Sequence, residues 1–142
     1  MRIVLDTNVL VSALINPGGS PHELLERWEA GEFTLVTSAE QHAEIQRVLS
    51  YKKLERFIRR DQAELLIANL RRQADFAEDL PVVDASEDAS DNLILATAIA
   101  GKASHVVTGD KVDLLSLRHV QGVSIITVRE AIEILSSQPR TG

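Results

Sequence analysis

Short, continuous runs of apolar residues recur along the chain and alternate with longer segments of helical periodicity. The runs lie at residues 3–5, 33–36, 106–107 and 123–126, and a briefer one lies at 81–83. Such a run is typical of a strand buried on both faces of a sheet. Strands that alternate with helices favour an α/β domain with a largely parallel sheet and helices on both of its faces.

The segments between these runs carry the signals of helices. Residues 7–15 read as a helix that ends at Asn16-Pro17. Further helices are predicted where a capping residue precedes Glu or Gln by three positions, and they begin at Ser20, Ser38, Asp61 and Thr127. Residues 92–100, after Ser90-Asp91, are so uniformly apolar that we expect a buried helix there.

Composition indicates one ordinary globular domain. The chain has 142 residues, of which 44% are apolar and 25% are charged. Cysteine is absent, which excludes disulfides, thiolate zinc sites and a cysteine nucleophile, and which fits a reducing cytoplasm. We therefore expect a single cytoplasmic domain over residues 1–136, followed by a flexible tail at 137–142.

Neither a membrane nor a nucleotide partner is indicated. The longest apolar stretch, residues 93–100, is far shorter than the roughly 20 residues that a membrane span needs. No glycine-rich phosphate loop occurs. The net charge of −6 argues mildly against a nonspecific nucleic-acid coat. It does not exclude a metal-dependent nuclease, because bound cations neutralise the carboxylates of such a site.

Four acidic residues stand where a parallel sheet would place them at one edge. Asp6 directly follows the first strand, and Asp110 follows the strand at 106–107 through a Thr-Gly turn. Glu44 lies in the helix after the second strand, and Asp91 opens the buried helix. Because open α/β sheets bind ligands beyond the carboxyl ends of their strands, we expect these four side chains to converge there.

A cluster of carboxylates favours a divalent cation. Like charges held close together disfavour joint ionisation, and hard oxygen ligands bind Mg²⁺ or Mn²⁺, which removes the repulsion. One or two such ions would support phosphodiester hydrolysis. Zinc is the poorer interpretation, because cysteine is absent and the histidines lie on different elements.

Each acid also has a purely structural explanation. Asp6 and Asp91 could cap the helices beside them, Glu44 could be a solvated helix residue, and Asp110 could form a turn. Four such coincidences at one sheet edge are less expected than one shared site.

The segments that carry these acids resemble the PIN-domain nucleases. They are residues 3–11, 38–49, 91–96 and 106–110, and they follow one another in the order and spacing of that family. The resemblance implies a three-layer α/β/α fold around a mainly parallel sheet of four or five strands, and cleavage of RNA that depends on Mg²⁺ or Mn²⁺. It implies that the catalytic metal ligands are Asp6, Glu44, Asp91 and Asp110.

The resemblance also suggests supporting residues. Asn8 falls on a polar position of the family where its amide could orient Asp6. Val112 separates Lys111 from Asp113, a departure from the usual turn that makes Asp113 a weaker candidate than Asp110. Asp88 is the second choice for the position assigned to Asp91.

Partners follow from the same resemblance. Many small members of the family are toxins of bacterial or archaeal toxin–antitoxin pairs, commonly dimeric and held inactive by an antitoxin protein. An antitoxin and a homodimer are therefore expected here. The apolar run at residues 9–15 also exceeds what one buried face needs, so a second subunit could cover part of it, although burial in the chain's own core is the alternative.

The densest basic segment is a candidate contact for the RNA backbone. It contains Lys52, Lys53, Arg56, Arg59 and Arg60. A basic segment of this kind holds phosphates, but a plain solvated helix face is an equally good explanation.

Two other functions compete with a nuclease. A phosphatase of the haloacid-dehalogenase type also begins with a strand that ends in Asp, but it needs a second Asp where this chain has Asn8. The stronger alternative is a catalytically silent PIN-like module that binds RNA or a partner protein. The complete set of four acids argues against that alternative.

Overall fold

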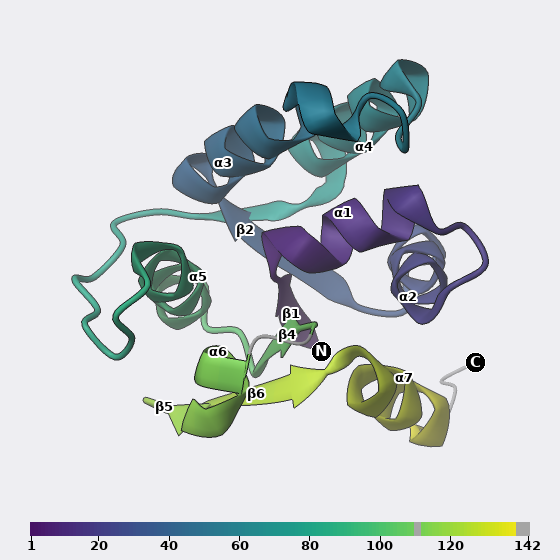
Figure 1. The fold of residues 1–142 in the computed structure, drawn as a ribbon. Coiled ribbons are helices and arrows are strands. Elements are labelled where there is room, and N and C mark those ends of the chain that lie inside the picture. Colours follow the sequence, from purple (N-terminus) through teal and green to yellow (C-terminus); the bar gives the residue numbers. More distant parts are fainter. Residues whose placement is uncertain (110–111, 139–142) are drawn as a thin grey trace.

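The computed structural model describes residues 1–109 and 112–138, in which a sheet lies between two layers of helices (Figure 1). Within these residues the sheet has six strands in the order β3-β2-β1-β4-β6-β5. All neighbours pair in parallel except β5, which is antiparallel to β6. The strands are β1 (Arg2–Leu5), β2 (Thr34–Ser38), β3 (Asp75–Ala77), β4 (His105–Thr108), β5 (His119–Val120) and β6 (Val123–Thr127).

The helices cover both faces of the sheet. They are α1 (Thr7–Ile15), α2 (Ser20–Glu29), α3 (Ala39–Leu49), the short 3₁₀ helix η1 (Lys52–Leu54), α4 (Arg60–Gln73), α5 (Ala89–Ala100), α6 (Val112–Leu117) and α7 (Val128–Ser137). Ile3 and Leu5 pack into one core with α1–α4 and α7, whereas Val4 packs into a second core with α5 and α6. The alternation along β1 therefore separates the two layers, and the expected α/β fold is confirmed.

The third strand was predicted in the wrong place. Residues 81–83 are not a strand, and Val82 is 99% exposed. The chain instead enters β3 soon after α4 ends and pairs there with β2. Pro81 lacks the N–H that a strand would use in pairing. With β3 and the short β5, the sheet has six strands rather than four or five.

Two predicted helix caps are also corrected. The N-cap of α2 is Gly19, so Ser20 is the first helical residue, and the N-cap of α4 is Arg59 rather than Asp61. The box of Thr127 and Glu130 is complete at the start of α7, as predicted. Ser38 caps α3 by accepting a hydrogen bond from the Gln41 backbone.

The apolar run on α1 is explained by the chain's own core. Val9, Leu10, Val11 and Ala13 are buried, and Ile15 is 39% exposed. This run therefore gives no support for a second subunit. Within the part of the chain that the structure describes, none of the helices combines the length and apolar character needed to cross a membrane.

Candidate active site

Asp6 lies at the carboxyl end of β1, where its carboxylate is almost completely buried. Its side chain and backbone together are 3% exposed. The Asp6 backbone N–H donates to the Val107 carbonyl at 2.9 Å, and Thr108 Oγ1 donates to Asp6 Oδ2 at 2.9 Å. Although Asp6 occupies the N-cap position of α1, the hydrogen bond described for its carboxylate crosses to β4 instead of running to the helix backbone. A helix cap therefore does not explain this acid.

Glu44 is tied to the same end of β1 through one intervening residue. Thr7 Oγ1 donates to Glu44 Oε2 at 3.0 Å, and Thr7 directly follows Asp6. Glu44 is partly buried on α3. Two of the predicted site residues, Asp6 and Glu44, are therefore brought to one edge of the sheet. Thr7 connects them, because it follows Asp6 in the chain and is hydrogen-bonded to Glu44.

Gln41 fixes α3 in the position that this contact requires. Its side-chain Nε2 donates to the Leu5 carbonyl at 2.8 Å, and its Oε1 accepts from Thr37 Oγ1 at 2.8 Å. Both bonds are buried. The sequence motif suggested that Gln41 would complete a capping box with Ser38, but the side chain instead docks the first turn of α3 on the end of β1. Glu44 lies three residues further along the same helix.

Asp91 lies in the first turn of α5 and is 1% exposed. Ser86 Oγ donates to Asp91 Oδ2 at 3.1 Å. The Asn92 side chain holds the preceding loop, because it accepts from the Ser86 backbone N–H and donates to the Ser86 carbonyl. A carboxylate buried to this extent needs hydrogen bonds or a cation to offset its lost hydration.

Asp88, the second choice for this position, has a structural role. It is the N-cap of α5, its carboxylate accepts from the Ser90 backbone N–H at 2.8 Å, and the residue is exposed. Capping by Asp88 also means that α5 begins at Ala89, three residues before the predicted start at residue 92. We therefore retain Asp91 as the candidate ligand.

A shallow cleft opens beside Glu44, between α3 and α5. Its volume is about 370 Å³, and it is lined by Glu40, Ala43, Glu44, Arg47, Ala89, Ser90 and Leu93. Arg47 lies three residues after Glu44 and so on the same face of α3. The exposed Arg47 and the candidate metal ligand Glu44 therefore line the same cleft, an arrangement that the sequence motifs did not indicate.

Asp110 lies outside the described residues, as does the side chain of Asp113. Among residues 1–109 and 112–138, the acidic and histidine side chains form no group of three or more that could hold a metal ion. The complete set of four acids therefore stays a prediction. The neighbouring β4 does reach the site, because Thr108 contacts Asp6 two positions before Asp110.

Each of the three acids that the structure describes is a type of metal ligand that suits a hard cation. Asp6, Glu44 and Asp91 present carboxylate oxygens, which Mg²⁺ and Mn²⁺ prefer as ligands. Asn8 is exposed, and its expected role in orienting Asp6 stays a prediction, whereas Thr108 makes a hydrogen bond of that kind.

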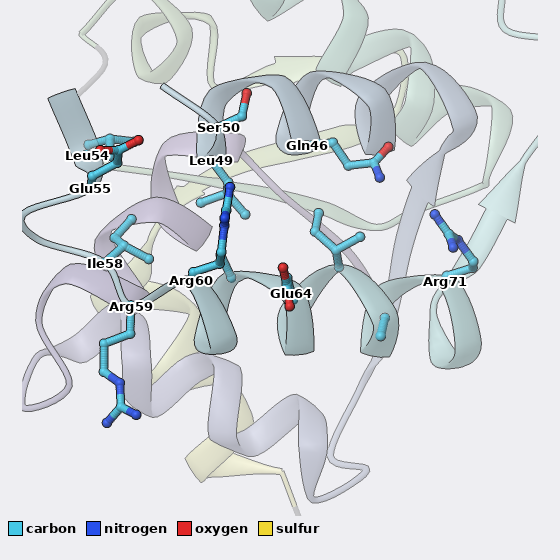
Figure 2. A pocket seen from close by; sticks show the side chains of 13 residues that line it. Gln46, Leu49, Ser50, Leu54, Glu55, Ile58, Arg59, Arg60, Glu64 and Arg71 are labelled. Carbon is cyan, nitrogen blue, oxygen red and sulfur yellow. The ribbon is translucent and has the colours of Figure 1, made fainter. Parts of the chain in front are cut away.

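The basic segment lies beyond the carboxyl end of α3, beside a groove of about 760 Å³ between α3 and α4. Figure 2 shows the Arg60 side chain reaching into this groove toward α3, while Arg59 points away from it. Arg59 is instead paired with Asp61 at 2.9 Å. The two arginines therefore do not share one face.

Comparisons with known proteins agree with this architecture. The model of the PIN domain matches residues 2–112, a range that contains all four predicted acids. The uncharacterized protein MJ1680 of Methanocaldococcus jannaschii is 31% identical over 124 residues, which cover 83% of this chain and 76% of the relative. No solved structure matches the chain significantly.

Proposed function

This chain belongs to the PIN-domain family, and from that membership we propose that it is a divalent-metal-dependent endoribonuclease. The observation that carries the proposal is the buried carboxylate of Asp6. It accepts a hydrogen bond from Thr108 on β4, and Thr7 beside it binds Glu44 on α3. Three elements distant in sequence thus orient acidic groups at one sheet edge, where a parallel sheet binds its ligands.

The proposed ligands are Asp6, Glu44, Asp91 and Asp110. When bound, Mg²⁺ or Mn²⁺ supplies activation of the attacking water and neutralisation of the charge that develops on the phosphodiester. Thr108 and Thr7 hold Asp6 and Glu44 in fixed orientations, so the site is organised before the substrate arrives.

Arg47 is placed to bind the substrate rather than the metal. It lines the cleft that contains Glu44, and a guanidinium is a good partner for the phosphate of a flanking nucleotide. We assign to it the positioning of the RNA strand across the acids.

We further propose that the enzyme is the toxin of a toxin–antitoxin pair, is dimeric and is inhibited by an antitoxin protein. The support for this role is the resemblance to the many small family members that are such toxins. Co-purification of the chain with the product of a neighbouring gene, and loss of RNA cleavage in that complex, would test it.

RNA cleavage with added Mn²⁺ tests the enzymatic proposal directly. Asp6→Asn should lower the cleavage rate by about 100-fold or more, because it removes a ligand charge from the reaction centre. The matched control is Asp79→Asn, since Asp79 is exposed and its φ of 57° suits asparagine as well as aspartate. No cleavage by the wild type with Mn²⁺ would favour the silent binding module. Equal cleavage by the wild type and Asp6→Asn would remove Asp6 from the proposed site.

A further inference from the structure

Two exposed aromatic side chains stand inside the basic segment of residues 51–60. Tyr51 is 39% exposed and Phe57 is 57% exposed. The other aromatic residues of the chain, Trp28, Phe33 and Phe76, are buried or partly buried. Both exposed rings are therefore concentrated in one stretch of ten residues, where neither contributes to the two cores.

Each of these rings lies beside a cation. Lys53 Nζ is 5.7 Å from the centroid of the Tyr51 ring, and Arg56 Cζ is 5.7 Å from that of Phe57. The segment carries five basic side chains and one acidic side chain, although the whole chain has a net charge of −6. Local positive charge on an acidic protein indicates an anionic partner for this surface.

The neighbouring groove between α3 and α4 combines apolar walls with charged side chains of both signs. Its walls contribute apolar side chains, including Leu49, Leu54 and Ile58. Figure 2 shows Arg60 projecting into it from the start of α4, with Arg71 near the other end of that helix. The charged residues of its lining are three arginines and two glutamates: Arg59, Arg60, Arg71, Glu55 and Glu64. Apolar walls with a small excess of positive charge suit a flexible polyanion that also carries flat apolar groups.

The groove is within reach of the acid site along a single helix. Glu44 and Tyr51 are seven residues apart, and α3 spans most of that interval. At a rise of 1.5 Å per residue, the basic segment begins about 10 Å beyond Glu44. A strand that passes over the acids therefore needs only a few more nucleotides to cross the segment.

We propose that residues 51–60 and the α3–α4 groove bind single-stranded RNA, with Tyr51 and Phe57 stacking on unpaired bases and the basic side chains contacting phosphates. The proposal rests on the proposed ribonuclease function and adds a second contact surface for its substrate, outside the acid site. Exposed rings need the free face of a base, which a duplex hides in its stack. Single strands are therefore bound in preference to duplexes of the same length.

The test is the binding of a fluorescein-labelled 12-nucleotide polyuridine RNA, measured by anisotropy in EDTA so that no cleavage occurs. Phe57→Leu should weaken binding about tenfold at every salt concentration, because it removes stacking but no charge. Arg56→Gln should weaken binding chiefly at low salt and reduce the slope of log affinity against log salt by about 0.7. The matched controls are Leu65→Ala, at an exposed position of α4, and Arg129→Gln, at an exposed position of α7. Figure 1 shows α4 at the top of the view and α7 at the bottom.

Wild-type affinity of Phe57→Leu and Tyr51→Leu would overturn the proposal, as would equal binding of single-stranded and duplex RNA. An acidic protein helix would then be the better candidate for the groove. The two proposals fail separately. If the wild type binds the RNA in EDTA but cuts none with Mn²⁺, only the ribonuclease proposal is ruled out. If Phe57→Leu binds RNA as tightly and cuts it as fast as the wild type, only the stacking surface is ruled out.

Discussion

Thr108 Oγ1 donates a 2.9 Å hydrogen bond to Asp6 Oδ2 across two adjacent parallel strands, 102 positions apart in the sequence. Both residues are buried. Leu5 pairs with Val107 in the register of β1 and β4, so the two side chains follow the last pair and meet just beyond it. The strand register itself thus orients the candidate ligand.

Thr108→Val should weaken Mn²⁺ binding and RNA cleavage by about 10-fold to 100-fold, because it removes the hydroxyl that orients the carboxylate. The variant keeps the shape and the strand preference of the side chain. Thr34→Val, at an exposed position of β2, is the control. Titration of Mn²⁺ in the cleavage assay measures both effects, and an unchanged Mn²⁺ dependence would rule out the orienting role.

Gln41→Leu should lower the free energy of unfolding by about 1–3 kcal/mol, because it leaves the Leu5 carbonyl and Thr37 hydroxyl without their buried partner. It should also reduce cleavage, since α3 would no longer be held against β1. Urea denaturation measures the first effect. Gln62→Leu, at an exposed position of α4, should leave the unfolding free energy nearly unchanged. Leucine is as good a helix former as glutamine, so a loss as large in that control would mean that the lost docking bonds are not the cause.

Arg47→Gln should raise the KM for RNA about fivefold and change kcat little, because the guanidinium contacts a phosphate outside the reacting centre. The effect should shrink as the salt concentration rises. Steady-state cleavage kinetics at low and high salt provide the measurement, with Arg129→Gln as the control. A fall in kcat at unchanged KM would instead place Arg47 at the reacting phosphate.

His105 should make stability depend on pH. Burial lowers the pKa of His105 below its ordinary value of 6.5, because the charged imidazolium loses hydration. The native state then binds fewer protons than the unfolded state, so the associated stability is fully present above pH 6.5 and is lost as the pH falls through the lowered pKa. Urea denaturation between about pH 5 and pH 7.5 should show this decline, and His105→Gln should reduce it. His119→Gln, at an exposed position, is the control, and an equal effect there would contradict the assignment.

Much of the fold could be predicted because its central elements carry strong local signals. The apolar strands and the bounds of α1 follow from hydrophobic pattern, and Asp6 is placed by the strand before it. β3 could not be predicted in the same way, because its sequence, Asp-Phe-Ala, has little strand character and its place is set by pairing with β2. The two residues of β5 are too few for any period.

The sequence could predict the acids of the candidate site but not the residues that hold them by hydrogen bonds. The acids could be selected because carboxylates after strands are chemically distinctive. The supporting residues could not: Thr108 is an ordinary strand residue, Thr7 opens a predicted helix, and Gln41 fits a capping box. Their roles depend on which elements become neighbours in space. The convergence of Asp110 with the other acids stays a prediction.

The alternation of β1 between the two cores has a consequence for how this chain tolerates insertions. Ile3 and Leu5 belong to one layer and Val4 to the other, and Asp6 continues from the same strand. One added residue within β1 would exchange the faces of every side chain before it relative to those after it. The strand could then either bury its apolar side chains in the correct cores or direct the Asp6 carboxylate toward Thr108, but not both. Two residues added together would restore the faces but move Asp6 past its partner, so packing and chemistry jointly fix the length of this strand.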